Sequence, residues 1–162
     1  MMRRFEESVA IVTGGAQGIG AATIRSFSKE GANVIILDQD IKKMKEVMHE
    51  IHSNGGKGQA FQCNITNKSE VENSMRQVIE IFGKIDILVN NAGVTKDNLL
   101  FRMDEEEWDT VIDTHLKGSF ICSQEAQKYM VEQGCGKIVM LSSRSALGKR
   151  GQINYATAKA GI

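Results

Sequence analysis

Residues 9–20 read VAIVTGGAQGIG, an apolar run that breaks abruptly into a loop with four glycines and then enters helix-favouring sequence. The pattern predicts a strand, a tight turn and a helix. Backbone without side chains can approach phosphates closely, and a helix that begins there directs free N–H groups and the positive end of its dipole toward them. We expect Gly14 to make the turn, Gly18 to allow the approach and Gly20 to let the helix lie against the strand. An ordinary glycine-rich turn has the same signature, so the stretch needs support from elsewhere.

A second apolar run, NVIIL at residues 33–37, supplies that support because it ends in Asp38. Gly20 and Asp38 are separated by close to the roughly 20 residues expected in a dinucleotide-binding unit. A carboxylate at this place accepts hydrogen bonds from both ribose hydroxyls of NAD and repels the additional phosphate of NADP. Asp38 could instead be a solvated strand end or the N-cap of the next helix, but the placement of the glycines favours the ribose.

The composition indicates one globular domain over residues 1–162, with 41% hydrophobic and 25% charged residues. Twenty basic and 20 acidic residues are interspersed, so we expect neither nucleic acid nor a membrane as a partner. The N-terminus lacks the apolar core of a signal peptide. Cys63, Cys122 and Cys135 show no CxxC or metal-ligand spacing, which favours reduced thiols and a cytoplasmic location. His49 and His52 lack a third ligand, so we expect an exposed pair and no metal site.

The hydrophobic periodicity alternates between strands and helices along the whole chain. We expect strands at residues 9–13, 33–37, 59–64, 85–89 and 138–141. Helices are expected at residues 21–30, 41–53 and 68–82, as one long helix at 105–133, and from about Tyr155 onward. This alternation predicts an α/β fold, a doubly wound, Rossmann-like parallel sheet with five strands and no domain linker.

A second group of polar residues follows the fifth strand. Tyr155 and Lys159 are four residues apart, so they share one face of a helix. A neighbouring ammonium favours the ionised form of a phenol, so Tyr155 can act as a general acid and base on a carbonyl or alcohol oxygen. A serine at the end of the strand can hold that oxygen. A Tyr/Lys pair alone is most often a surface pair, but these side chains all follow the carboxyl end of a parallel strand, where open α/β sheets bind ligands.

The successive motifs resemble those of the short-chain dehydrogenase/reductase family. They are TGGAQGIG at residues 13–20, NNAG at 90–93, a serine near residue 143 and YxxxK at 155–159, and they occur in the family's order over nearly the entire chain. Within the family, residues 96–103, 107–109 and 151–155 resemble the 3-oxoacyl-[acyl-carrier-protein] reductases, although sugar and polyol dehydrogenases share parts of these stretches. The resemblance implies an NAD(P)-dependent oxidoreductase that passes hydride between nicotinamide and a carbonyl or secondary alcohol. The implied substrate is a 3-oxoacyl thioester, as in fatty acid synthesis.

The resemblance also implies roles for individual residues. Tyr155 would exchange the proton, Lys159 would bind the nicotinamide ribose, and the serine would orient the carbonyl. The neutral Gln17 and the acidic Asp38 favour NAD(H), with NADP(H) as the alternative. The implied partners are a small carbonyl compound or acyl thioester, acyl carrier protein, and further copies of the full-length chain in a homo-oligomer. The residues expected to contact the cofactor are Gly14, Gln17, Gly18, Ile19, Gly20, Asp38, Asn64, Ile65, Asn90, Ala92, Gly93, Ser142, Tyr155 and Lys159.

The sequence departs from the family pattern at three internal places. His115 occupies the position of a helical asparagine that supports a proton-relay water, so it is a candidate for that catalytic role. Asn64 replaces an aspartate at the adenine edge, where an amide can still form hydrogen bonds. The catalytic serine is Ser142 by the spacing to Tyr155 and Ser143 by the register of the fifth strand. We choose Ser143, because length changes are easier in the loop that follows.

The fourth departure is that the sequence stops at Ile162, whereas family members continue with two further strands and a segment that closes over substrate. We therefore expect an incomplete domain whose fifth strand, residues 138–141, has an unpaired apolar edge. Two alternatives to an active reductase follow from this departure and from His115. One is a non-catalytic nucleotide-binding or oligomerising module, and the other is an inactive fragment of such an enzyme.

Overall fold

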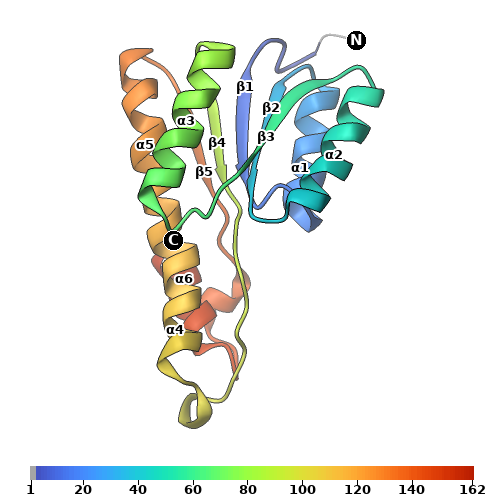
Figure 1. Cartoon of the computed structure of the whole chain (residues 1–162). Coiled ribbons are helices and arrows are strands. Elements are labelled where there is room, and N and C mark those ends of the chain that lie inside the picture. The colour runs from blue at the N-terminus through green and yellow to red at the C-terminus, as the bar shows by residue number, and fades with distance from the viewer. Residues whose placement is uncertain (1–2) are drawn as a thin grey trace.

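A computed structural model describes residues 3–162 as a parallel sheet between two layers of helices (Figure 1). The strands are β1 (Val9–Thr13), β2 (Asn33–Asp38), β3 (Lys57–Gln62), β4 (Ile87–Asn90) and β5 (Lys137–Met140). The helices are α1 (Gly18–Lys29), α2 (Ile41–Ser53), α3 (Lys68–Phe82), α4 (Glu105–Ile112), α5 (Gly118–Glu132) and α6 (Ile153–Gly161). Three short turns complete the chain, the 3₁₀ turns η1 (Leu100–Arg102) and η3 (Arg144–Leu147) and the π-helical turn η2 (Asp113–Lys117).

The sheet has the order β3-β2-β1-β4-β5, and all neighbouring strands are parallel. All five residues of β1 and all four of β4 are buried, as expected for strands that are covered on both faces. Alternate side chains separate the core into two halves. Ile11 and Ile35 pack with α3 and α5, whereas Val12 and Ile36 pack with α1 and α2.

The strand order reverses between β1 and β4, because the chain moves outward first to β2 and β3 and then to the other side. Open α/β sheets bind ligands at such a switch point, outside the carboxyl ends of the strands. The loop after β1 and the segment after β4 meet there. Beyond this end of the sheet lie α4 and α6, as Figure 1 shows.

The predicted doubly wound sheet with five strands is confirmed, but several boundaries differ. β3 covers residues 57–62 rather than 59–64, because this edge strand begins with the weakly patterned Lys57 and Gly58. The expected long helix at residues 105–133 is interrupted by η2. Apolar residues occur both before and after the interruption, so the hydrophobic pattern alone does not reveal it.

Side chains cap the N-termini of α3 and α4. Asp104 and Glu107 form a complete capping box at the start of α4. Asn67 caps α3, but its side chain accepts from the N–H of Ser69. Glu70 reaches past the cap and accepts from the backbone N–H of Asn64 at 2.7 Å, so it orders the end of β3.

The edge of the sheet at β5 is apolar, as expected. Ile138, Val139 and Met140 are 38%, 45% and 40% exposed, and β5 pairs with β4 on its inner side. Within residues 3–162 no helix is long and apolar enough to cross a membrane.

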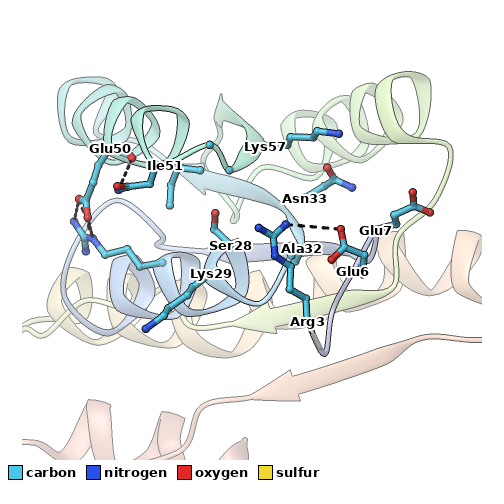
Figure 2. A pocket seen from close by; sticks show the side chains of 15 residues that line it. Arg3, Glu6, Glu7, Ser28, Lys29, Ala32, Asn33, Glu50, Ile51 and Lys57 are labelled. Atoms are coloured by element: carbon cyan, nitrogen blue, oxygen red, sulfur yellow. Dashed lines mark hydrogen bonds and ion pairs between the residues drawn. The ribbon is translucent and has the colours of Figure 1, made fainter. Parts of the chain in front are cut away.

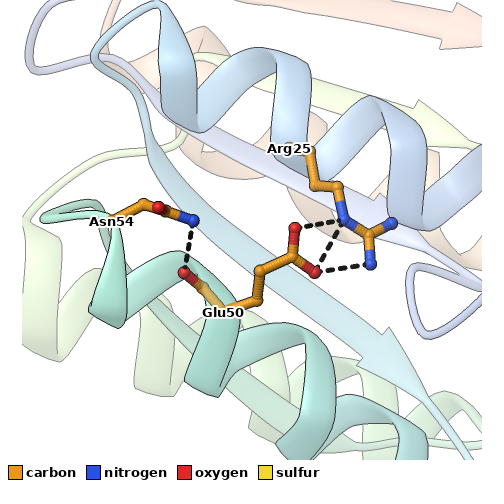
Figure 3. Close-up of polar contacts among 3 residues, drawn as sticks. All are labelled: Arg25, Glu50 and Asn54. Atoms are coloured by element: carbon orange, nitrogen blue, oxygen red, sulfur yellow. Dashed lines mark hydrogen bonds and ion pairs between the residues drawn. The ribbon is translucent and has the colours of Figure 1, made fainter.

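A pocket of about 570 Å³ lies at the opposite, amino edge of the sheet, between the ends of α1 and α2 and the starts of the strands (Figure 2). Its charged side chains largely pair with one another. Arg25 of α1 forms an ion pair with Glu50 of α2 at 2.7 Å, and Asn54 donates to the Glu50 carbonyl (Figure 3). Arg3 faces Glu6 at 3.8 Å. This pocket is remote from the carboxyl ends of the strands, so we do not assign the function to it.

The burial of β2 predicts that replacing two different isoleucines by alanine will destabilise the protein to very different extents. Ile35 is fully buried, whereas Ile41 at the start of α2 is 43% exposed. Ile35→Ala should lower the free energy of unfolding by about 2–5 kcal/mol, because it leaves a cavity between packed layers. Ile41→Ala, the matched control, should lower it by less than about 1 kcal/mol. Urea unfolding followed by circular dichroism measures both, and equal losses would contradict the assigned packing.

Candidate functional site

The glycine loop leaves the N-terminus of α1 open. Gly14 and Gly18 have φ values of 64° and 54°, which disfavour other residues. The N-cap residue, Gln17, makes no side-chain capping bond, and the first turn of α1 contains no acidic residue. The first backbone N–H groups of a helix have no intrahelical acceptor. An anion is therefore the complementary group for this end of α1.

Gly18 and Gly20 are suited to the loop for different steric reasons. Nothing lies within 4 Å of the position that a Cβ of Gly18 would occupy, so the space above this residue is open. A Cβ on Gly20 would lie 2.1 Å from the carbonyl oxygen of Gly14, because the first turn of α1 packs directly on the loop. Ile19 between them is 69% exposed beside the open space. The loop thus fits the close approach of a diphosphate.

Thr13 and Asn91 join the glycine loop to the end of β4, and the sequence analysis missed both. The Asn91 amide donates to the carbonyls of Thr13 at 2.9 Å and Gly14 at 3.1 Å. The Thr13 hydroxyl oxygen accepts from the N–H groups of Asn91 and Ala92. A Cβ on Gly14 would lie 2.7 Å from the Ala92 Cα, so the two segments are in contact. The NNAG motif contained this signal, but only the contact shows what its second asparagine does.

Asp38 braces the loop from the end of β2. One carboxylate oxygen accepts from the Ala16 N–H at 3.0 Å and the other from the Asp40 N–H at 3.1 Å. The N-cap of α2 is Asp40, which excludes the alternative that Asp38 caps this helix. Lys43 lies beside the loop and donates to the Gln17 side chain at 2.8 Å. A cation is therefore present next to the neutral Gln17.

The other residues expected to contact a cofactor lie at different depths. Asn64 is half-buried, and its side-chain oxygen accepts from the N–H and hydroxyl groups of Thr66. Ile65 is buried in the core, where a Cβ on Gly118 would lie 2.6 Å from its Cδ1. Asn90 is also buried and donates to the Ser123 hydroxyl at 2.9 Å, while its oxygen has no protein partner. Ile65 and Asn90 therefore lie inside the protein and contact groups of the chain itself.

Tyr155 and Lys159 lie on one side of α6, as their spacing predicts. The Lys159 ammonium is 5.6 Å from the centroid of the Tyr155 ring and donates to the Leu141 carbonyl at 2.6 Å. Burial lowers the pKa of Lys159. The start of α6 is anchored by Asn154, whose amide donates to the carbonyls of Lys96 and Glu107.

The two candidate serines make different contacts. Ser142 donates its hydroxyl proton to the Lys159 carbonyl at 2.6 Å, so it ties the end of β5 to α6. Ser143 caps η3 by accepting from the Ser145 N–H at 3.1 Å. Acting as an acceptor leaves the Ser143 proton available to another oxygen. These contacts favour Ser143 as the residue that can hold a substrate oxygen.

His115 is buried in η2 beside Tyr155. Its Nε2 lies 2.9 Å from the Val94 carbonyl oxygen and 3.2 Å from the Val94 nitrogen, and its Nδ1 has no protein partner. Burial is the main cause that lowers the pKa of His115, and the charge of Lys159 lowers it further, while the contact with Val94 opposes the shift. A neutral imidazole therefore occupies the position at which the family resemblance implies an asparagine.

No group of three or more histidine, cysteine or acidic side chains within residues 3–162 is arranged to hold a metal ion. The His52 ring contacts the Gly58 carbonyl at 3.2 Å. Cys63 and Cys122 are buried, Cys135 is exposed, and all three are free thiols.

The open, parallel α/β sheet with polar groups at its carboxyl edge is a Rossmann-like fold, and comparison with known proteins identifies the family. Residues 8–162 match the short chain dehydrogenase family, so the chain belongs to this family. Among curated relatives, 3-oxoacyl-[acyl-carrier-protein] reductase FabG of Staphylococcus aureus is 45% identical over 155 residues, which cover 94% of this chain and 63% of the relative. The corresponding protein of Thermotoga maritima is 42% identical over 160 residues, covering 98% and 65%.

Other similar proteins carry different names. The (2S)-[(R)-hydroxy(phenyl)methyl]succinyl-CoA dehydrogenase subunit BbsD of Thauera aromatica is 40% identical over 158 residues. The crystal structure of gox2181 superimposes with a TM-score of 0.94 at 34% identity, covering 99% of this chain and 64% of that one. NAD+-bound xylitol dehydrogenase gives 0.95 at 26% identity, covering 98% and 62%. The chain thus spans less than two thirds of the length of each of these proteins.

A substitution of Asn91 tests the contact between the loop after β1 and the segment after β4. Asn91→Asp replaces the donor by a carboxylate facing the carbonyls of Thr13 and Gly14, so stability should fall by about 1–3 kcal/mol. Asn73→Asp, on the exposed side of α3, is the control and should change stability by less than about 0.5 kcal/mol. Thermal unfolding measures both, and an unchanged midpoint for Asn91→Asp would refute the contact.

Proposed function

We propose that the chain is the nucleotide-binding and catalytic part of an NAD(P)-dependent reductase that transfers hydride between nicotinamide and a carbonyl or secondary alcohol. The observation that carries this proposal is the uncapped, glycine-lined N-terminus of α1 at the same sheet edge as Tyr155 and Lys159. A diphosphate would suit the N-terminus of α1, and a ribose with its nicotinamide would suit the pair Tyr155 and Lys159. The bound cofactor would supply the hydride.

The protein's contribution is the placement of its polar groups. Gly18 and the first N–H groups of α1 would hold the diphosphate, and Asp38 would face the adenosine ribose. Ser143 would donate to the carbonyl oxygen of the substrate, and Tyr155 would give its proton to that oxygen as hydride arrives at the carbon. Lys159 would bind the nicotinamide ribose and favour the phenolate that remains.

The substrate class follows from the relatives rather than from a contact. Relatives with more than 40% identity are named 3-oxoacyl-[acyl-carrier-protein] reductases, and a relative at 40% carries the name of a CoA-thioester dehydrogenase. We therefore propose a 3-oxoacyl thioester, carried on acyl carrier protein, as the substrate. A cytoplasmic location and a homo-oligomer of the full-length protein belong to the same proposal.

The cofactor preference depends on opposing charges near the glycine loop. Asp38 favours NAD(H), although both of its oxygens already accept a backbone N–H bond. Lys43 is close enough to Gln17 to attract a ribose phosphate. We propose NAD(H) as the preferred cofactor, because the carboxylate ends the strand at the position expected for the ribose.

Titration of the purified 162-residue chain with NADH, followed by an assay of acetoacetyl thioester reduction, tests the proposal. Saturable binding together with turnover is expected. Binding without turnover, here and in a longer form of the protein, would favour a non-catalytic module. No binding at all would reject the nucleotide site.

Tyr155→Phe should lower the rate of carbonyl reduction at least about 100-fold, because the proton donor is removed. NADH affinity should stay within about twofold, because the ring and its packing remain. Stopped-flow assays and fluorescence titration measure the two quantities. Turnover at the wild-type rate would exclude Tyr155 as the acid.

Asp38→Ala should weaken NADH binding about tenfold, because an ionised acceptor for the ribose hydroxyls is lost. Binding of NADPH should strengthen, since the Asp38 carboxylate no longer repels the additional phosphate, while Lys43 stays paired with Asp40 at 3.0 Å. The ratio of the two dissociation constants, measured by calorimetry, is the readout. An unchanged ratio would remove Asp38 from the cofactor site.

A further inference from the structure

We propose that Gly93, His115 and Tyr155 form a packed stack in which the imidazole ring of His115 positions the phenol ring of Tyr155. This inference rests on the proposed function, because it assigns the stack to the catalytic acid. It gives His115 a packing role that differs from the water-holding role implied by the family resemblance.

The first contact of the stack joins the segment after β4 to η2. A Cβ on Gly93 would lie 2.1 Å from Cε1 of His115 and 2.9 Å from each of its ring nitrogens. The imidazole therefore stands directly on the backbone of Gly93, and any side chain there would displace it. The π-helical turn that carries His115 is the local distortion that brings the ring to this position.

The second contact joins His115 to α6. The rings of His115 and Tyr155 have their centroids 5.2 Å apart at an angle of 84°, an edge-to-face arrangement that aromatic pairs favour. The Lys159 ammonium lies 5.6 Å from the centroid of the same phenol ring. The position of Tyr155 is thus defined by an imidazole and an ammonium.

Only one of the two ring nitrogens of His115, Nε2, has a hydrogen-bond partner in the protein. A single tautomer can serve only one of the two Val94 groups near Nε2, and Nδ1 is buried with no protein partner. The residue is 2% exposed, so solvent contributes little. The contact of Nε2 with the Val94 backbone holds the imidazole in the orientation in which it packs on Gly93 and on the phenol ring, and we infer that this packing is what the site uses.

Two substitutions separate ring packing from hydrogen bonding. His115→Asn keeps a side chain that can reach a backbone group but removes the ring, so kcat should fall about tenfold through misplacement of the acid. The KM for the thioester should change less than kcat, because binding of the substrate elsewhere is untouched. His115→Phe, which keeps a ring without nitrogen atoms, should restore most of the lost kcat. The opposite ranking of the two variants would overturn the proposal.

A double-mutant cycle tests the contact with Gly93. Gly93→Ala should lower kcat about tenfold in the wild type, because the methyl group displaces the imidazole. In the His115→Asn background the shorter side chain removes this clash, so the two losses should not multiply. Independent, multiplying losses would mean that Gly93 acts without His115.

An NMR measurement tests the stack without any turnover. The chain has two tyrosines, so ring-labelled Tyr155 can be assigned by comparison with Tyr155→Phe, and Tyr129 serves as an internal reference. His115→Asn should shift the Tyr155 ring signals, and His115→Phe should keep them displaced from the values of an exposed tyrosine. A Tyr155 signal that ignores both variants would refute the stack even if the protein reduces thioesters. A shifted signal in an inactive protein would reject the proposed function alone.

Discussion

The arrangement depends on the contact between the turn after β1 and the turn after β4. Asn91 and Thr13 satisfy one another's backbone groups across this junction, and Gly14 lets the two chains touch. The contact fixes the direction in which α1 leaves the sheet, and therefore the direction in which its free N–H groups point. Because the space above Gly18 is open, the junction leaves a backbone surface that suits an anion.

The second half of the site is built by polar ties between segments that are far apart in sequence. Asn154 bonds to the backbone of the segment after β4 and to α4, and Lys159 and Ser142 each bond across to the end of β5 or α6. These ties give a helix of only nine residues a defined position beyond the sheet. Short helices obtain their stability from such contacts more than from propensity.

Much of the fold could be predicted because its signals are local. The buried runs at β1 and β4 and the glycines at 14–20 each carry their own evidence in a few residues. The break at η2 left no such trace, since hydrophobic residues continue on both sides of it. Asn91 and Thr13 were missed for a related reason, because their importance lies in a contact between residues 78 positions apart. The orientation of Asp38 toward the loop and the burial of Ile65 and Asn90 likewise depend on tertiary contacts, which a local sequence pattern does not reveal.

Backbone amide signals of the ¹⁵N-labelled chain, followed during titration with NADH, test whether a nucleotide's diphosphate rests on the N-terminus of α1. We expect the largest and earliest shifts at Gly18, Ile19 and Gly20, followed by shifts of signals near Tyr155. Shifts confined to Arg25, Gly56 and Lys57 would contradict it, because the ligand would then occupy the pocket at the opposite edge of the sheet.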